Sequence, residues 1–330
     1  MNEWLNQILG SNLKISRIKS NLSSRETFRV KTRERIFIVK KYADRTKMNH
    51  DIQGSLFARD VAHIQTPTII AVNDKLRTVI LGFIHGCSLS EYLMTNKFNE
   101  RTFKIIESFG RVVSKLHNAN FQQTKNFHRL YINNGLKIET KKLEESINYF
   151  KSLLSQSGFS DNYIPFYKNR LLENLNSIKL FCYLLKDKLK ERDSEIAVIH
   201  GDLWSGNVLL MEEKKSIKVG LFDFEWSSLG NPVVDISRIY SRGLVPRNLK
   251  KRYSVIPPPK LWEAFCKGYN NSKMLSEKGM LFKGSLIYSH IRTINYYKTL
   301  IELSHNNRLN QRILKTIFRI SSSLVDYLQL

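Results

Sequence analysis

The sequence predicts an α+β protein of two lobes, with a small N-terminal lobe built on an antiparallel sheet and a larger, mostly helical C-terminal lobe. Two observations predict this division. Short segments that alternate apolar and polar side chains lie mainly within residues 12–84, as expected for strands with one buried face. Beyond Gly86, apolar residues mostly recur at helical spacing. We therefore place the boundary between residues 1–84 and residues 85–330.

The small lobe is expected to consist of short strands around one helix. Apolar residues near one face of residues 50–64 predict that helix, and Pro67 closes it. Alternation and turn residues predict strands at 13–18, 27–31, 36–40, 69–72 and 78–84.

The large lobe is expected to be helical except around one group of short strands. Helices are predicted at 103–117, in two pieces around Pro165 within 136–192, and again over 260–330. A short strand is predicted at 196–199, and a hairpin at 208–211 and 217–222. The strongest polar motifs follow these strands.

Composition bounds the class of protein. No uncharged apolar run is long enough for a membrane-spanning helix, and the N-terminus lacks the basic region of a signal peptide. Cys87, Cys182 and Cys266 form neither a metal pattern nor a disulfide framework, so we expect a cytoplasmic protein. The net charge of +24 favours anionic ligands such as nucleotides, phosphorylated metabolites, nucleic acid or acidic membranes, without choosing among them.

Two carboxylates and an amide follow the short strands of the large lobe. Asp202 comes directly after a strand and the flexible Gly201, so its carboxylate is expected at a strand end facing a cleft. Asn207 lies five residues later, near enough for the loop to present its amide oxygen beside Asp202. Asp223 follows the next apolar strand and can face the same cleft. Oxygen ligands of this kind suit Mg²⁺.

This order of residues indicates a reaction. Phosphoryl transfer needs metal ions on the triphosphate, a cation on the phosphates and a carboxylate that orients the attacking hydroxyl. The pattern Asp-x4-Asn, then a strand, then Asp-Phe matches the catalytic and metal loops of kinases. The sequence therefore predicts a phosphotransferase that depends on ATP and Mg²⁺.

The segment from Val198 to Tyr240 resembles the aminoglycoside phosphotransferase family, which also includes choline, fructosamine and related small-molecule kinases. His200-Gly201-Asp202 resembles the catalytic motif of that family. Gly230-Asn231-Pro232 followed by Asp235 resembles its Gly-Asp-Pro-x-x-Asp segment. Residues 203–207 are nearest to fructosamine kinases, whereas Phe224-Glu225 is nearer to choline kinases, so the motifs do not select a subfamily.

The resemblance implies a bilobal protein-kinase-like fold, with a nucleotide-binding lobe over 1–84 and a catalytic and substrate-binding lobe over 85–330. It implies that Asp202 is the catalytic base and that Asn207 and Asp223 are magnesium ligands. His200 is expected to brace the catalytic loop, and Asp235 to support that loop by hydrogen bonds.

The small lobe is expected to bind the nucleotide. Lys40 ends a strand, as the phosphate-binding lysine of a kinase does, and strand alternation turns the neighbouring Lys41 to the opposite face. Kinases pair this lysine with a helix glutamate, but residues 50–64 contain no Glu. Gln53 falls nearest to the expected place, with Asp51 two residues earlier, and Gln53 could hydrogen-bond Lys40 without neutralising it.

Two further segments are candidates for nucleotide contacts. The loop at 20–26 resembles the nucleotide loop of the family, and its Ser23 and Ser24 could contact phosphates, although an ordinary polar hairpin explains each serine as well. Residues 79–86 resemble the hinge between the lobes, where backbone groups of Gly82 and Ile84 would hold adenine.

The expected acceptor is a hydroxyl compound. Residues 231–330 carry 17 Lys and Arg against five Asp and Glu, which argues against a polycationic aminoglycoside and favours a neutral or anionic small molecule. Sugars, amino sugars, amino alcohols and nucleoside-like compounds are the candidate classes. The alternative is a kinase-fold protein that acts on a protein or an RNA-associated target through its basic surface. A nucleic acid partner stays open but is not favoured, because no recognised nucleic-acid module is present. The sequence says nothing of the oligomeric state.

Overall fold

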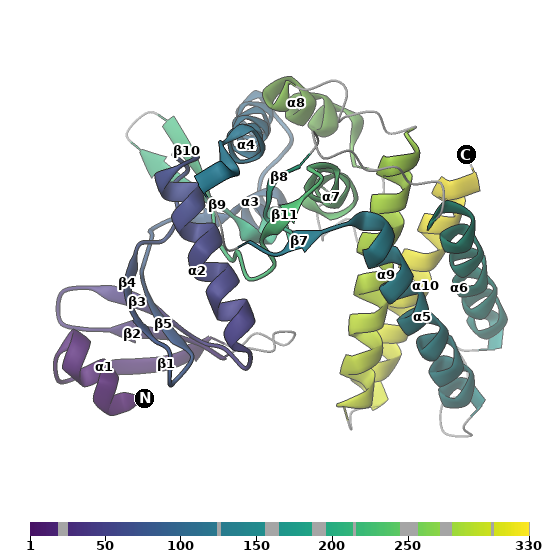
Figure 1. The fold of residues 1–330 in the computed structure, drawn as a ribbon, viewed down its shortest axis with the longest axis horizontal. Helices are drawn as coiled ribbons and strands as arrows, with labels where there is room; N and C mark the ends of the chain where they lie inside the picture. The colour runs from purple at the N-terminus through teal and green to yellow at the C-terminus, as the bar shows by residue number, and fades with distance from the viewer. Residues whose placement is uncertain are drawn as a thin grey trace.

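The computed structural model describes residues 1–18, 26–123, 127–155, 165–186, 196–213, 216–244, 257–270, 279–304 and 307–329. Figure 1 shows a sheet-rich region at the N-terminal end, joined to a larger helical region that carries the C-terminus. The chain passes from one to the other after Gly82, over residues 83–86. The expected order of a small sheet lobe followed by a larger helical lobe is thus confirmed.

The small lobe is a five-stranded antiparallel sheet in the order β1-β2-β3-β5-β4. Its strands are β1 (Lys14–Ile18), β2 (Glu26–Lys31), β3 (Ile36–Lys41), β4 (Ile69–Asn73) and β5 (Thr78–Gly82). All five lie close to the predicted segments, because alternating side chains suit a sheet whose faces bury different partners.

Each face of this sheet is covered by one helix. Helix α1 (Asn2–Leu9) buries Leu5 against Val30, Phe37, Val39 and Ile80. Helix α2 (Arg45–Asp60) buries Met48 against the opposite face, together with Tyr42, Val79 and Leu81. Lys40 therefore points toward α2, since it shares the face of Ile38 and alternates with Val39.

Helix α2 begins five residues before the predicted start at residue 50. Asp44 caps it, because its carboxylate accepts a hydrogen bond from the Thr46 amide at 2.8 Å. The apolar pattern of this helix is weak at its start, so the capping residue rather than the hydrophobic face defines where it begins. The extra turn brings Lys47 into the helix.

Two short sheets form the centre of the large lobe. Strand β6 (Cys87–Ser88) joins the hairpin of β9 (Val208–Glu213) and β10 (Ser216–Leu221). Strand β11 (Ser228–Gly230) lies between β7 (Arg129–Leu130) and β8 (Ala197–Ile199). The sequence predicted β8, β9 and β10, which carry the polar motifs at their ends.

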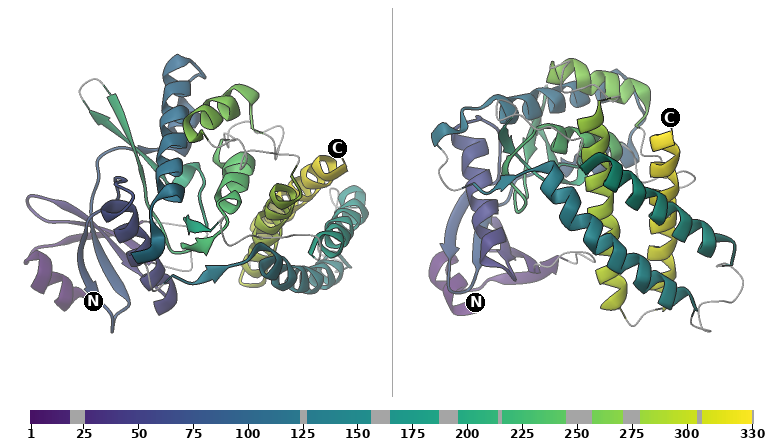
Figure 2. Two further views of the ribbon diagram at one scale, coloured as in Figure 1. Left: turned by 45° about the horizontal axis from the view of Figure 1, so that its top comes forward. Right: turned by 45° about the vertical axis from the view of Figure 1, so that its right-hand side comes forward.

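Helices surround these sheets. Helices α3 (Leu89–Thr95) and α4 (Glu100–Asn118) follow the connection, and α8 (Pro259–Tyr269) packs along α4. Helix α7 (Val233–Arg238) continues into a π-helical turn, η5 (Ile239–Gly243). Figure 2 shows the four long helices together at the far end of the lobe: α5 (Ile132–Ser155), α6 (Pro165–Lys186), α9 (Met280–Glu302) and α10 (Asn307–Gln329).

Pro165 stands at the first position of α6, where its missing N–H costs nothing. Within the described part of the chain, no helix is both long and apolar enough to span a membrane.

Candidate active site

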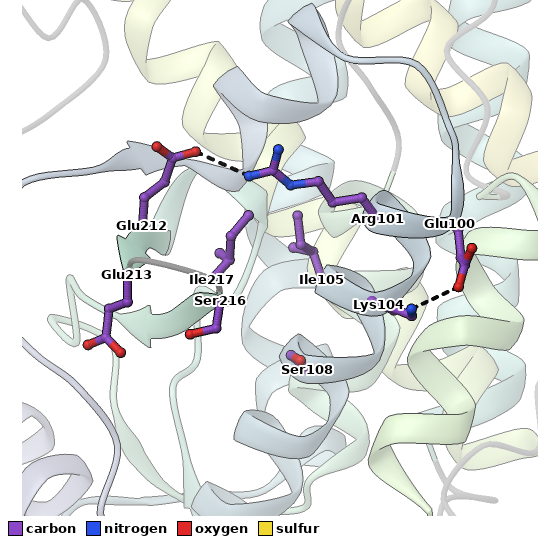
Figure 3. Close-up of a pocket in the computed structure, with 9 residues that line it drawn as sticks. All are labelled: Glu100, Arg101, Lys104, Ile105, Ser108, Glu212, Glu213, Ser216 and Ile217. Atoms are coloured by element: carbon purple, nitrogen blue, oxygen red, sulfur yellow. Dashed lines mark hydrogen bonds and ion pairs between the residues drawn. The ribbon is translucent and has the colours of Figure 1, made fainter.

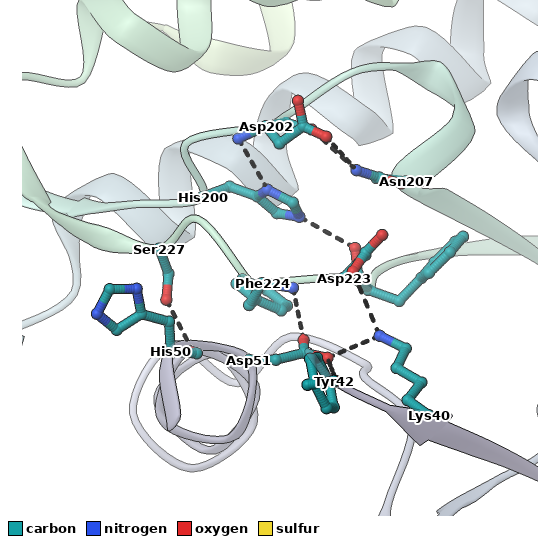
Figure 4. Close-up of polar contacts among 11 residues, drawn as sticks. Lys40, Tyr42, His50, Asp51, His200, Asp202, Asn207, Asp223, Phe224 and Ser227 are labelled. Carbon is teal, nitrogen blue, oxygen red and sulfur yellow. Dashed lines mark hydrogen bonds and ion pairs between the residues drawn. The ribbon is translucent and has the colours of Figure 1, made fainter. Parts of the chain in front are cut away.

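Lys40 joins two carboxylates from different lobes (Figure 4). Its Nζ lies 2.7 Å from Oδ2 of Asp51 on α2 and 3.3 Å from Oδ1 of Asp223, which follows β10. The lysine is only 5% exposed, so its charge is held by these partners rather than by water. Lys41, by contrast, is exposed and pairs with Glu26 at 3.4 Å.

The helix residue that neutralises Lys40 is Asp51 and not Gln53, which sequence reasoning placed nearest to the lysine. Asp51 accepts hydrogen bonds from Lys40, from the Tyr42 hydroxyl and from the Phe224 amide, the last at 2.7 Å. Two residues along a helix correspond to about 200° of rotation, so only one of these two side chains can face the sheet. Oε1 of Gln53 is buried and has no hydrogen-bond partner among the described residues.

The loop after β8 places Asp202 beside Asn207, as the spacing predicted. The amide nitrogen of Asn207 donates to the Asp202 carbonyl at 2.9 Å and to its Oδ2 at 3.3 Å. The other carboxylate oxygen, Oδ1, accepts a hydrogen bond from Nη2 of Arg238 on α7. The Asp202 side chain keeps 20% of its surface exposed, so it remains accessible to a small molecule.

Gly201 has a left-handed backbone, with φ of 74°. A Cβ at this position would lie 2.1 Å from the Trp226 carbonyl, so only glycine fits. The close approach brings the loop of Asp202 against the segment that follows Asp223.

Buried polar groups hold this loop from below. Asp235 is fully buried and accepts hydrogen bonds from the amides of His200 at 2.7 Å and Gly201 at 2.9 Å, while Nε2 of His117 lies 3.1 Å away. Burial alone would raise the pKa of Asp235, but the hydrogen bond and charge of His117 and the His200 amide outweigh it and lower the pKa. Asp235 therefore stays an anion and touches the loop backbone, not Asp202.

His200 connects the two motifs. Its ring is fully buried, with Nε2 3.0 Å from the Phe222 carbonyl and Nδ1 3.4 Å from the Asp202 amide. This arrangement fits a neutral ring that donates through Nε2 and accepts through Nδ1. His200 thus links the residue before Asp223 to Asp202 (Figure 4).

Asp223 sits in a strained conformation, with a left-handed φ of 74°. Helix α2 packs directly on the segment that follows it. A Cβ on Gly54 would lie 2.6 Å from both Phe224 Cβ and Ser227 Oγ, and the Ser227 hydroxyl donates to the His50 carbonyl at 2.9 Å. Asp223 is therefore fixed by contacts with both lobes.

The oxygen atoms in this site fit magnesium better than zinc. Asn207 donates through its amide nitrogen, which leaves its amide oxygen as a ligand atom, and Asp223 supplies a carboxylate. No group of three His, Cys, Asp or Glu that could hold a metal occurs in the described ranges. A carboxylate and an amide are a sufficient protein contribution for Mg²⁺, which keeps waters and takes phosphate oxygens.

The other predicted nucleotide contacts lie in or near the small lobe. The amide of Gly82, at the end of β5, donates to the Thr68 carbonyl at 2.8 Å, so only its carbonyl is left for a ligand. Ile84 follows in the connection and is half-buried. Ser23 and Ser24 fall outside the described residues.

A cavity of about 780 Å³ lies elsewhere, between α4 and the β9–β10 hairpin (Figure 3). Its lining includes the ion pairs Arg101–Glu212 and Glu100–Lys104 and contains none of the predicted site residues. The arrangement of the predicted site residues, rather than this cavity, locates the candidate active site.

Sequence reasoning missed Arg238, which contacts Asp202, and Arg292 and Trp226, which lie against the neighbouring Gly201. Arg292 on α9 lies 3.4 Å from the Gly201 carbonyl, and its guanidinium is 4.2 Å from the centre of the Trp226 ring. No local motif marks these residues. The only available signal was the basic excess of residues 231–330, which we used for its bulk charge alone.

Comparisons with known proteins identify the family and the fold of the chain. The family described as "Phosphotransferase enzyme family" matches residues 14–256. A comparison with curated protein sequences finds no significant match. Among solved structures, the chain is similar to a spectinomycin phosphotransferase in complex with ADP and spectinomycin, with a TM-score of 0.67 and 16% identity, covering 99% of this chain and 97% of that one.

Two other solved structures are similar over nearly the whole chain. An ADP-bound aminoglycoside phosphotransferase gives a TM-score of 0.63 at 14% identity, covering 98% of each chain. An ethanolamine kinase from Plasmodium vivax gives a TM-score of 0.59 at 14% identity, covering 97% of this chain and 85% of that one. These likenesses confirm the predicted bilobal kinase-like fold.

Proposed function

The chain belongs to the phosphotransferase enzyme family, and we propose that it transfers the γ-phosphate of ATP, with Mg²⁺, to a hydroxyl group of a small molecule. The observation that carries this proposal is the meeting of Lys40 from one lobe with Asp223 from the other, at 3.3 Å, next to the Asp202–Asn207 pair. Kinase chemistry requires a cation, a metal-binding carboxylate and a base at one place.

Lys40 and the connection between the lobes would bind the nucleotide. The lysine charge suits the triphosphate, and Asp51 keeps the ammonium group oriented from behind. Adenine would bind to the Gly82 carbonyl and the Ile84 amide, because the Gly82 amide is already engaged by Thr68. Ser23 and Ser24 remain proposed phosphate contacts.

Asn207 and Asp223 would hold the metal. Magnesium, when bound, neutralises charge on the triphosphate and so favours departure of the diphosphate. The left-handed backbone of Asp223 and the contacts of Phe224 with α2 set the direction of this carboxylate before any ligand arrives.

Asp202 would orient the acceptor hydroxyl. As the acceptor oxygen forms its bond to the γ-phosphorus, the bond from that phosphorus to the β–γ bridging oxygen of ATP breaks and ADP leaves. The hydroxyl proton passes to Asp202 and from there to solvent. Asn207 and Arg238 hold the two carboxylate oxygens, so Asp202 meets the hydroxyl in a fixed geometry.

The proposed acceptor is neutral or anionic. The similar solved structures include enzymes named for spectinomycin and ethanolamine, which carry amino groups, so the family scaffold does take small amine-bearing hydroxyl compounds. In this chain, however, the side chains beside Asp202 include Arg238 and Arg292, which repel a polycation. The small-molecule character of these enzymes also favours this proposal over a kinase that acts on a protein or an RNA-associated target.

Substitution of Asp202 tests the proposal. Asp202→Asn is expected to reduce ATP-dependent phosphorylation of an accepted hydroxyl compound by at least about 100-fold, because a proton acceptor and an orienting charge are lost. Binding of ADP and Mg²⁺, measured by calorimetry, should stay within about twofold of the wild type, since Asp202 is not among the proposed nucleotide contacts.

The acceptor is first found by an ATP-consumption screen over sugars, amino alcohols, nucleosides and hydroxy acids. Asp60→Asn is the matched control, because Asp60 is an exposed acid that pairs with Arg59 at the C-terminal end of α2. Wild-type turnover by Asp202→Asn would reject the assigned mechanism.

A further inference from the structure

Three arginines gather near Asp202 from three elements of the large lobe. Arg238 stands at the end of α7, Arg242 one turn later in η5, and Arg292 on α9. Helix α9 anchors the first two through residues one turn apart. Nη1 of Arg238 lies 3.3 Å from the Ser289 hydroxyl, and Nη1 of Arg242 lies 3.0 Å from the Thr293 hydroxyl.

The third arginine, Arg292, contacts the loop that carries Asp202. Nη1 of Arg292 reaches the Gly201 carbonyl at 3.4 Å, next to the base itself. The pKa of Arg238 falls to about 10, chiefly through burial, and Asp202 counteracts this while Arg292 and Arg242 add to it. We call Arg238, Arg242 and Arg292 the arginine cluster.

The arginine cluster carries three positive charges but has fewer carboxylate partners to balance them. Among the residues that the structure describes, one ion pair, Arg238–Asp202, links the cluster to a carboxylate. Within the described residues, Arg242 contacts the Thr293 hydroxyl, and Arg292 contacts the Gly201 carbonyl and the rings of Trp226 and Tyr288, all of them neutral groups. Like charges that are close together and partly removed from water destabilise the folded protein. Binding of an anion reduces this cost.

Arg238 also has an unsatisfied donor. The residue is only 7% exposed, and its Nε has no hydrogen-bond partner within the described ranges. Buried donors are nearly always paired, and guanidinium groups are well matched to the oxygen atoms of phosphates and carboxylates.

The surroundings of the cluster are unsuited to a cation. Trp226 is 39% exposed beside the catalytic loop, and its ring is the surface on which a ligand ammonium group would be expected to stack. Lys47 already lies 4.5 Å from the ring centre and Arg292 lies 4.2 Å from it. Both are cations of the protein itself. They already contact the ring and would repel a cationic acceptor that approached it.

We propose that the acceptor carries, besides its reactive hydroxyl, an anionic phosphate or carboxylate group that binds to Arg242 and Arg292. Arg238 takes a positioning role, since it holds Asp202 on the side opposite Asn207. This inference rests on the proposed function and narrows its acceptor from neutral or anionic compounds to anionic ones.

Titration of inorganic phosphate tests the anion site directly. Calorimetry is carried out with ADP and Mg²⁺ present, so that the nucleotide site is filled. Arg242→Gln and Arg292→Gln should each weaken phosphate binding at least about tenfold, because each removes a charged hydrogen-bond donor. Arg292→Lys should retain part of the affinity. Arg101→Gln, a change of an exposed arginine paired with Glu212, should leave the affinity unchanged.

Two outcomes of this titration overturn the inference. One is wild-type protein that binds no phosphate. The other is phosphate binding that survives in the Arg242→Gln and Arg292→Gln variants and is lost only in Lys40→Met, because the anion would then occupy the nucleotide site. Thermal melts of each variant establish that a weakened affinity is not caused by unfolding.

Paired acceptors extend the test to turnover and separate the two anions. Glucose is compared with glucose 6-phosphate, and glyceramide with glycerate. The anionic member of at least one pair should have the higher kcat/KM. Arg292→Gln should lower kcat/KM for that anionic acceptor by raising its KM.

The two proposals can fail separately. Asp202-dependent turnover that prefers neutral or cationic acceptors and ignores Arg292→Gln rejects the inference and leaves the proposed function standing. Phosphate binding that depends on the arginines, without any turnover that depends on Asp202, rejects the proposed function and leaves the anion site standing.

Discussion

Asp51 is predicted to be the most sensitive acidic residue of the small lobe. Its carboxylate receives Lys40 at 2.7 Å, the Tyr42 hydroxyl, and the Phe224 amide at 2.7 Å, and the residue is only 4% exposed. Asp51→Asn removes the charge and places an amide group against the Lys40 ammonium. Loss of one member of a buried ion pair costs about 3–5 kcal/mol.

The asparagine keeps one acceptor oxygen, so we expect the lower end of this range, about 3 kcal/mol in the free energy of unfolding. For a chain of 330 residues, that loss corresponds to a fall in melting temperature of about 4 °C. Circular dichroism at 222 nm during heating measures it, with denaturant unfolding as a second reading.

Asp60→Asn is the matched control, because it changes the same residue type on the same helix. Asp60 pairs with Arg59 where the side chains are 54% and 39% exposed, so its loss should cost below about 1 kcal/mol. Equal melting temperatures for Asp51→Asn and Asp60→Asn would refute the reasoning. A double variant, Lys40→Met with Asp51→Asn, should lose less stability than the sum of the two single variants, because each single variant already removes the Lys40–Asp51 pair.

Gly54→Ala should destabilise the protein by about 1–3 kcal/mol, because the added Cβ would lie 2.6 Å from Phe224 and Ser227. Thermal melting measures this loss. Gly82→Ala is the control, because the nearest atom there is 3.7 Å away, and equal melting temperatures for the two variants would contradict the prediction. Asp235→Asn should show a pH-dependent loss. The pKa of Asp235 is lowered in the folded protein, so its contribution is present above about pH 4 and is lost as the pH falls through the folded pKa. The gap in unfolding free energy between wild type and Asp235→Asn should therefore be widest near neutral pH and narrow in acid, and a gap that stays constant from pH 7 to pH 3 would refute the assigned charge.

The motif residues of the large lobe were accessible to sequence reasoning because they follow strands. Strand ends fix the direction of the chain, so the short spacing between Asp202 and Asn207 implied contact, and the structure places Asn207 Nδ2 3.3 Å from Asp202 Oδ2. The same holds for Lys40, since alternation along a strand separates it from Lys41. The roles of these residues in catalysis stay predictions.

Residues on helices were harder to assign. The partner of Lys40 depends on the rotational setting of α2, and the predicted start at residue 50 gave no way to choose between Asp51 and Gln53. The capping hydrogen bond of Asp44 marks the true start, yet the choice of Asp51 needs the packing of Met48 on the sheet. Such contacts come from tertiary structure and leave no periodic signal.

The arginine cluster could not be found from sequence for a related reason. Arg238 and Arg292 lie on different helices, and the side of α9 that faces Asp202 is set by the packing of α9 against α5, α7 and α10. The surplus of positive charge was visible in composition, but its concentration beside the base was not. Bulk charge thus predicted the sign of the ligand but gave no location for its binding site.

The position of Trp226 gives the protein a built-in optical reporter. Its indole lies between Lys47 of the small lobe and Arg292 of the large lobe, with the cationic groups 4.5 Å and 4.2 Å from the ring centre. Charges this close to an indole shift its emission, so a change in the separation of the lobes alters the fluorescence of a ring that is already partly exposed. Replacement of Trp4, Trp204 and Trp262 by Phe would leave Trp226 as the single tryptophan, and any change in its distance from Lys47 or Arg292 would then be visible without an attached dye.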